Sequence, residues 1–271
     1  MTDVLCKAGV HIDNFKIDKT EHIKVFLLTH AHKDHAPKNI KTFQHNIYCS
    51  FLTATTLKHP KIFILQIDHW YNIEGVSIYV FETVHCPGSL AFYFEEFQIL
   101  HLGDTRVTTS LLQTIDGLQP KMIFYDNTHQ HFRGMFPSLE TSAIMLQQAI
   151  NEKFSNQKKI NLCLPHIGAI LLLQLLNQKV QADISLKPAV LQMMQHLKLI
   201  DPHSLISAVG VKHKDIDIIP SSQFFVFNKI NPHEEIKIGN LIRVFASFHA
   251  GHSELQLLSK YTLISLHHDE R

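Results

Sequence analysis

Residues 24–29 read KVFLLT, and residues 30–35 follow directly as HAHKDH. The first six residues form a compact, β-favouring apolar run, which predicts a short buried strand. The next six residues place three histidines and one carboxylate at the end of that strand. Imidazole nitrogen with carboxylate oxygen is a donor set that suits Zn²⁺, while Mn²⁺ and Fe²⁺ are less favoured alternatives. A histidine-rich surface loop is the competing interpretation. We predict a metal site at this strand end, with four candidate ligands: His30, His32, Asp34 and His35.

Two further polar side chains follow predicted strands. His85 comes after residues 76–84 (VSIYVFETV), and Asp104 comes shortly after residues 99–102 (ILHL). A carboxylate can bridge two cations, so Asp104 is the predicted bridging ligand. Each residue alone would be ordinary in a turn. Their shared position at strand ends predicts that they join the histidines of the first loop.

The whole chain has the composition of a globular protein. Its 271 residues are 45% hydrophobic and 18% charged, with a formal net charge of +1. This length allows one large domain or two modest ones. The 21 histidines are dispersed, which excludes a tag-like tract. Because the net charge is near zero, any binding of nucleic acid must rely on a local groove and on bound metal.

Neither a membrane span nor a signal peptide is expected. No apolar run approaches the roughly 18 residues that a spanning helix needs. The N-terminal MTDVLCKAGV lacks a basic start followed by an apolar stretch. The chain has only four cysteines, widely separated and without a CxxC pair. A disulfide framework and a cysteine-rich zinc site are therefore not expected, and a reducing compartment is the simpler expectation.

The pattern of elements changes along the chain. The first 130 residues predict mostly short strands, and strand-type runs return after residue 213. Between them, Ser138 predicts the cap of a helix that extends to Lys153, and further helices are expected at 168–178 and 188–199. The order predicts one α/β domain interrupted by an insertion. The predicted boundaries are 1–133 for the first part, 134–212 for the insertion and 213–271 for the second part.

Three motifs together resemble the DNA cross-link repair nucleases of the β-CASP group, within the metallo-β-lactamase fold. They are HAHKDH at 30–35, HCPGSLAF at 85–92 and ILHLGDTR at 99–106. Shorter segments agree with that family: Ile12-Asp13, YCS at 48–50, YDNT at 125–128, FPS at 136–138, SFH at 247–249 and SEL at 253–255. The resemblance implies an α/β fold, a metallo-β-lactamase αββα sandwich with an inserted small β-CASP domain.

The resemblance also implies which residues carry the chemistry. The first metal ion would be held by His30, His32, His85 and Asp104. The second would be held by Asp34, His35, the bridging Asp104 and His249. Asp126 matches an acidic motif that supports the site, so the implied catalytic residues are Asp34, His35, Asp104 and Asp126. One or two zinc ions are implied, with manganese or iron as alternatives.

The implied function is a metal-dependent DNA nuclease, a 5′→3′ exonuclease in DNA repair or telomere maintenance. In such an enzyme a water activated by two cations attacks phosphorus in line, and a 5′-phosphate is left. The implied partner is DNA, single-stranded or with 5′ ends, and the implied location is the nucleus. Three alternatives remain: an RNA-processing β-CASP endonuclease, a catalytically impaired homologue that binds nucleic acid or protein, and a small-molecule hydrolase of the same fold.

The sequence departs from the family at two places. Several relatives grip a 5′-phosphate with Ser-x-Gly-Lys, and the matching residues 166–169 read HIGA, so Ala169 replaces the lysine. His267 is a candidate for the last β-CASP motif, where histidine is typical of the RNA branch. Residues 151–200 hold six lysines and two acidic residues, which predicts either a phosphate-binding strip or a solvated helix face. Further candidate phosphate contacts are Lys33, Lys38 and Arg106.

Overall fold

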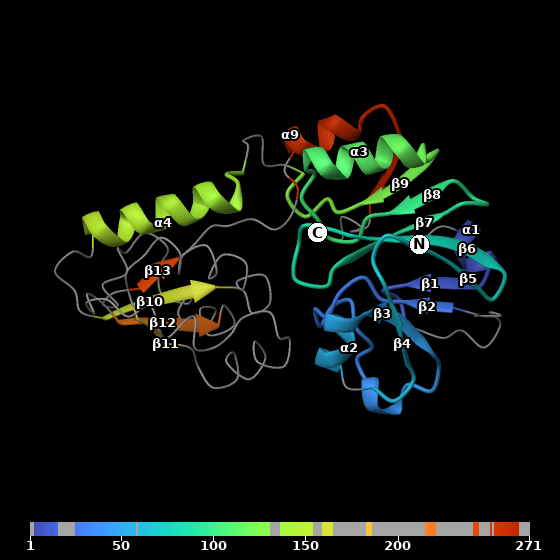
Figure 1. Ribbon diagram of the computed structural model, residues 1–271, viewed down its shortest axis with the longest axis horizontal. Helices are drawn as coiled ribbons and strands as arrows, with labels where there is room; N and C mark the ends of the chain where they lie inside the picture. The colour runs from blue at the N-terminus through green and yellow to red at the C-terminus, as the bar shows by residue number, and fades with distance from the viewer. Residues whose placement is uncertain are drawn as a thin grey trace. The chain divides into compact units, whose positions relative to one another are not determined.

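The computed structural model consists of two compact units (Figure 1). The first unit is formed by Met1–Phe136 and Phe248–Arg271, and the second by Pro137–Ser247. The structure describes residues 3–15, 25–57, 59–130, 136–153, 159–164, 183–185, 215–220, 241–243, 250 and 252–265.

The first sheet of the first unit has four parallel strands. In spatial order they are β1 (Val10–Ile12), β2 (Val25–Leu27), β3 (Ile47–Ser50) and β4 (Ile62–Leu65). Parallel neighbours require crossover connections. The helices around these strands are α1 (Asp3–Lys7), the 3-10 turn η1 (Ile40–Thr42) and α2 (Phe51–Leu57). The strand predicted from KVFLLT is confirmed as β2.

The second sheet of this unit has six strands in the order β14-β9-β8-β7-β6-β5. Their bounds are β5 (His69–Ile73), β6 (Val76–Glu82), β7 (Leu90–Phe94), β8 (Ile99–His101), β9 (Met122–Tyr125) and β14 (Thr262–Ser265). Strands β5 to β8 form an antiparallel meander, whereas β8, β9 and β14 are parallel. Helix α3 (Thr109–Leu118) connects β8 to β9, and the Thr108 hydroxyl caps it by accepting from Leu111 N at 3.2 Å.

The two sheets pack face to face, with helices on both outer faces. Strand β7 shows this in its own side chains, because all five are buried. Leu90, Phe92 and Phe94 belong to the cluster between the sheets, which β2 also lines. Ala91 and Tyr93 belong to the cluster beneath α3 and the C-terminal helical segment. Burial on both faces explains the unbroken apolar run LAFYF.

The opposite outer face is covered by α2. Ala54 and Leu57 of α2 pack against Ile47 and Cys49 of β3. The layer order is therefore helix, sheet, sheet, helix, and the predicted αββα sandwich is confirmed. No helix in the described part of the chain is long and apolar enough to cross a membrane.

The second unit contains α4 (Leu139–Lys153) and a parallel sheet in the order β11-β12-β10-β13. Its strands are β10 (Lys159–Leu164), β11 (Asp183–Ser185), β12 (Asp215–Pro220) and β13 (Leu241–Arg243). The predicted cap of α4 is confirmed, since Thr141 N donates to the Ser138 hydroxyl at 3.1 Å. Strands β12 and β13 pair with β10, and the second unit as a whole runs from Pro137 to Ser247. The boundaries 134–212 for the insertion remain a prediction.

Several elements differ from the sequence prediction. The prediction of mostly strands before residue 130 omitted α2 and α3. After residue 213, where strand-type runs are predicted, the chain also forms a short helix, α9 (His252–Leu255), followed by a 3-10 turn, η2 (Gln256–Leu258). The helices expected at 168–178 and 188–199 lie outside the described residues.

Candidate metal centre

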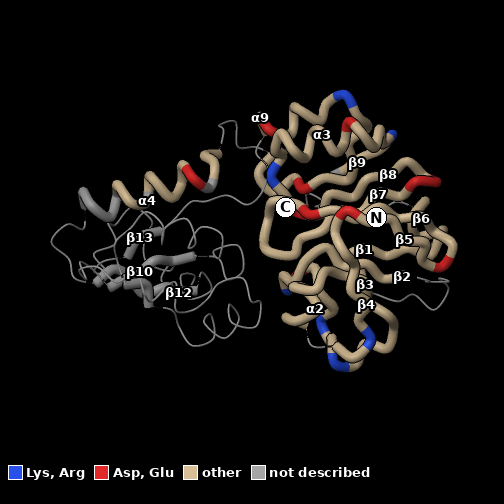
Figure 2. The backbone as a smooth tube through the Cα atoms, in the orientation of Figure 1, with Lys and Arg blue, Asp and Glu red and all other residues tan. Residues whose placement is uncertain are grey.

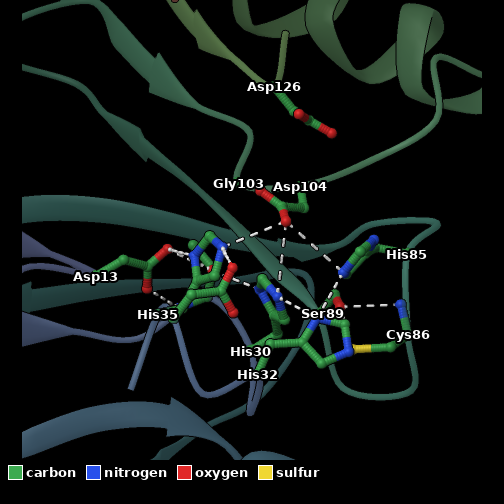
Figure 3. A network of polar contacts seen from close by, with 12 residues as sticks. Asp13, His30, His32, His35, His85, Cys86, Ser89, Gly103, Asp104 and Asp126 are labelled. Carbon is green, nitrogen blue, oxygen red and sulfur yellow. Dashed lines mark hydrogen bonds and ion pairs between the residues drawn. The ribbon is translucent and has the colours of Figure 1, made fainter. Parts of the chain in front are cut away.

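Three loops, each following a strand, bring the candidate ligands together (Figure 3). They follow β2, β6 and β8, so the ligands come from both sheets of the sandwich. Backbone hydrogen bonds join the loops: Leu90 N donates to Thr29 O at 2.9 Å, and Arg106 N donates to Val84 O at 2.9 Å. The first bond crosses from the second sheet to the first. These contacts fix the loops to one another without help from the site side chains.

Four of the predicted ligands converge on one point. His32 Nδ1 lies 2.9 Å from His30 Nε2 and 3.0 Å from His85 Nε2. The Asp104 carboxylate oxygen Oδ2 lies 3.9 Å from His30 Nε2 and 3.8 Å from His85 Nε2. His30, His85 and Asp104 are buried, and His32 is half-buried. The residues that the motifs assign to a first metal ion are therefore neighbours.

The ligands expected for a second ion are only partly described. His35 Nε2 lies 3.3 Å from Asp104 Oδ2 and 3.8 Å from Asp34 Oδ2. The Asp34 side chain is 77% exposed, so it lies at the open side of the cluster. His249 lies outside the described residues, as do Ala169 and His267.

Asp13, which in the sequence only matches a short segment of the family, takes part in the centre. Its carboxylate accepts from Thr29 N at 2.8 Å and from the Thr29 hydroxyl at 2.6 Å. His35 Nδ1 lies 2.8 Å from Asp13 Oδ2. A carboxylate behind a histidine fixes the orientation of the imidazole ring. Only the family motif could have pointed to this residue, because the contacts span 16 and 22 positions of sequence.

Two of the histidines, His30 and His35, have pKa values shifted in opposite directions. Burial, together with the neighbouring His35 and His85, holds the pKa of His30 well below its usual value. Burial also acts to lower the pKa of His35, but hydrogen bonds to Asp104 and Asp13 raise it to about 11. The site thus favours the neutral imidazole of His30, the form that binds a metal. The two carboxylates beside His35 favour a positive charge at that ring, which a proton supplies here and a metal ion would supply in its place.

The donor set fits a divalent metal ion. Donor atoms around a tetrahedral zinc ion lie about 3.3 Å apart, because Zn–N distances are roughly 2.0–2.1 Å. The closest separations here, 2.9 and 3.0 Å between imidazole nitrogens and 3.3 Å between His35 and Asp104, are near that value. Three imidazoles and a carboxylate match the ligand types of zinc and related ions. His30, His32 and His85 form one possible ligand group, and Asp13, His30 and His35 form another.

Asp126 lies at the end of β9 and is almost fully buried (Figure 3). Its carboxylate oxygen Oδ1 accepts from Thr128 N at 2.9 Å and from the Thr128 hydroxyl at 2.6 Å. These bonds make a tight turn directly after the strand. The structure thus places the predicted acidic residue at a fourth strand end, on the strand that neighbours β8.

Arg106, a candidate phosphate contact in the sequence, is instead paired with a carboxylate of its own chain. Its Nε donates to both carboxylate oxygens of Glu254, at 2.9 and 3.0 Å, and its Nη2 also pairs with Glu254. A further bond runs from Nη2 to Phe136 O at 3.1 Å. Only 11% of the Arg106 side chain is exposed. Lys33 and Lys38 are exposed, so they remain candidate phosphate contacts.

The loop that carries His85 depends on Gly88. This residue has φ +82°, and its carbonyl oxygen accepts from the Ser50 hydroxyl at 2.6 Å. A Cβ atom at Gly88 would lie 2.6 Å from Ser50 Oγ and 2.7 Å from Leu52 Cβ. The close approach of the loop to β3 and α2 is therefore possible only for glycine.

Gly88→Ala should destabilise the first unit by about 3 kcal/mol, because the added methyl group combines backbone strain with a steric clash. Gly75→Ala is the matched control, since Gly75 has a similar φ of +84° but no atom within 4 Å of its Cβ position. That change should cost only about 1 kcal/mol of strain. Urea unfolding monitored by fluorescence compares the two. Equal losses would show that the contact with Ser50 and Leu52 does not constrain the loop.

A four-layer αββα sandwich with a histidine and aspartate cluster at its strand ends defines a metallo-β-lactamase type of protein. The chain is 27% identical to the 5′ exonuclease Apollo of Mus musculus over 251 residues, which cover 84% of this chain and 46% of that protein. It is 29% identical to the DNA cross-link repair 1A protein of Mus musculus over 157 residues, covering 54% of this chain and 15% of that protein. The chain is thus a homologue of DNA repair nucleases of the β-CASP group, and the resemblance seen in its motifs is confirmed.

A comparison with solved structures concerns the fold alone. A crystal structure of a protein of unknown function from Enterococcus faecalis V583 matches the fold with a TM-score of 0.64 and 12% identity. It covers 92% of this chain and 77% of that chain. No protein-family model matches the chain. The chain spans about half the length of the Apollo proteins that it matches.

Proposed function

We propose that this protein is a metal-dependent DNA nuclease that hydrolyses phosphodiester bonds from the 5′ end. The convergence of His30, His32, His85 and Asp104 carries the proposal, because no packing role requires three imidazoles and a carboxylate at one point. The similarity to a 5′ exonuclease over 84% of the chain supports cleavage from the 5′ end. The similarity to a DNA cross-link repair protein over 54% of the chain supports DNA as substrate and a role in DNA repair, and we propose the nucleus as the place of action.

In this proposal His30, His32, His85 and Asp104 hold a first zinc ion. Asp34, His35, Asp104 and His249 hold a second, with manganese or iron as alternatives to zinc. Such ions supply positive charge that lowers the pKa of water and neutralises the phosphate oxygens. The reaction adds the oxygen of water to phosphorus and breaks the bond to the 3′ oxygen, which leaves a 3′-hydroxyl and a 5′-phosphate.

The protein's own side chains position these groups. Asp13 accepts hydrogen bonds from Thr29 and lies within hydrogen-bonding distance of His35, so it fixes the ring of His35 relative to the first loop. Asp34 is exposed at the open side of the cluster, where it can orient a water molecule against the substrate. Asp126 shapes the turn after β9 next to the loop of Asp104. We assign the second unit, 137–247, as the inserted domain of the β-CASP group.

The proposal is tested with the purified full chain, stripped of metal with a chelator and reloaded with zinc or manganese. The substrates are end-labelled single-stranded DNA and RNA, each with a 5′-phosphate or a 5′-hydroxyl. We expect stepwise shortening of DNA from its 5′ end only after metal is restored. Asp34→Ala should lower the rate about 100-fold or more. Glu74→Ala removes an exposed carboxylate at the β5–β6 turn and should leave the rate unchanged.

Other outcomes would assign other functions. Faster cleavage of RNA than of DNA would indicate an RNA-processing enzyme. Metal and DNA binding without cleavage would indicate a homologue that only binds. A preference for 5′-phosphate would show that end recognition does not need the lysine that Ala169 replaces. Activity that survives complete metal removal would contradict the proposal.

A further inference from the structure

Three aromatic residues form a row across the outer face of the second sheet. Trp70 on β5 is paired with Tyr79 on β6, which is paired with Tyr93 on β7. The Trp70 ring lies 5.2 Å from the Tyr79 ring and 6.1 Å from the Tyr93 ring. Side chains of paired residues point to the same face of a sheet. We call this surface, formed by Trp70, Tyr79 and Tyr93, the aromatic face.

The helices of the first unit cover only one end of the aromatic face. Tyr93 is 5% exposed and packs in the cluster that contains Leu111 and Ile115 of α3. Tyr79 is half-buried at the edge of that cluster, and Trp70 lies outside it with 50% of its surface exposed. Strand β5 is the edge of its sheet. A tryptophan at a sheet edge that the described part of the first unit leaves half uncovered is typical of a protein–protein contact.

The strands that carry the aromatic face have fixed charges of one sign. Residues 68–96, which form these strands and their turns, contain no lysine or arginine but five acidic residues: Asp68, Glu74, Glu82, Glu95 and Glu96. Figure 2 shows acidic but no basic positions along β5, β6 and β7. Asp68 accepts from the Tyr79 hydroxyl at 3.4 Å, and Glu95 accepts from the Ser77 hydroxyl at 3.0 Å. Both carboxylates are exposed, one on each side of the aromatic row.

This combination selects one chemical class of occupant. The strands of this face carry exposed carboxylates and no cation of their own, which repels a phosphate backbone, so nucleic acid does not suit this face. A second copy would bring the same negative charges together, which disfavours a symmetric dimer through it. A lysine or arginine side chain can stack on an aromatic ring while its charge faces a carboxylate. We propose that the aromatic face docks a lysine- and arginine-rich segment of a partner protein.

Trp70 makes the test direct, because it is the one tryptophan of the chain. The full-length protein is titrated with a 12-residue peptide of alternating arginine and glycine while its tryptophan fluorescence is recorded. We expect a saturable change in emission, protection of Trp70 from acrylamide quenching, and weaker binding at higher salt. A peptide of alternating glutamate and glycine should have no effect.

Variants then locate the binding. The double variant Asp68→Asn/Glu95→Gln should bind the arginine peptide about tenfold more weakly, since two exposed charge pairs are lost. Trp70→Ala, measured by calorimetry, should lose about tenfold or more. Glu140→Gln removes an exposed carboxylate from the second unit and should change the affinity less than twofold.

The proposal is overturned by any of three results. The first is the lack of any fluorescence change with the arginine peptide at low salt. The second is equal binding by the wild-type protein and the double variant. The third is a dimer in sedimentation that Trp70→Ala abolishes, which would assign the aromatic face to a second copy. None of these results depends on nuclease activity, so the proposed function is tested separately.

Discussion

Asp104→Asn should lower the rate of DNA hydrolysis about 100-fold or more and reduce the metal content of the protein. Asp104 Oδ2 is the atom that lies within 3.9 Å of three imidazole nitrogens, those of His30, His35 and His85. Asparagine keeps the shape of the side chain but removes its negative charge and exchanges one oxygen for an N–H donor. Metal content by mass spectrometry and hydrolysis of end-labelled DNA measure the two effects.

Asp116→Asn provides the matched control for this change. Asp116 is an exposed carboxylate on α3 that accepts hydrogen bonds from Lys260 and Tyr261. Its replacement is chemically identical but leaves the histidine cluster intact, so activity and metal content should not change. Urea unfolding of Asp104→Asn distinguishes loss of the site from loss of the fold. A well-folded variant with normal metal content and normal rate would show that Asp104 is not a ligand.

Glu254→Ala should destabilise the first unit by about 3–5 kcal/mol. The change leaves the Arg106 guanidinium buried without the carboxylate that now accepts its Nε hydrogen bonds. Only 10% of the Glu254 side chain is exposed, so water cannot easily replace it. Urea unfolding followed by the emission of Trp70 reports on this unit, because the single tryptophan lies in β5.

Two controls separate the buried charge from the loss of packing. Arg106→Met/Glu254→Leu replaces the pair with apolar side chains of similar size and should recover most of the lost stability. Asp116→Ala breaks the exposed pair with Lys260 and should leave stability almost unchanged. If Glu254→Ala is as mild as Asp116→Ala, the buried ion pair does not hold the C-terminal segment in place.

The sequence predicts the parts of the centre that are local in the chain. HAHKDH, His85 and Asp104 each follow a strand, and strand ends on packed sheets meet at common edges. The contacts that Asp13 and Arg106 make could not be predicted in the same way. The contact of Asp13 with His35 spans 22 residues, and that of Arg106 with Glu254 spans 148. No local pattern encodes which distant partner a charged side chain will meet.

Weak helix propensity also explains why the sequence prediction omitted part of the fold. Helix α3 has the sequence TSLLQTIDGL, in which β-branched residues and Gly117 weaken the helical pattern. Its burial against the second sheet, through Leu111 and Ile115, supplies the stability that its own sequence lacks. The end of the second unit is hard to predict from the sequence for a similar reason. Strands β12 and β13 look like strands of any sheet, and only their pairing with β10 shows which sheet they join.

The first unit is discontinuous in the chain, and this constrains the order in which it can be completed. The described candidate ligands lie between His30 and Asp104, so they leave the ribosome before the second unit does. The edge strand β14 and the carboxylate that neutralises Arg106 follow the second unit in the chain, so they are synthesised after it. More than a hundred residues are therefore synthesised between the loops that hold the candidate ligands and the strand that completes the sandwich. Metal acquired during that interval would bind to a half-built protein.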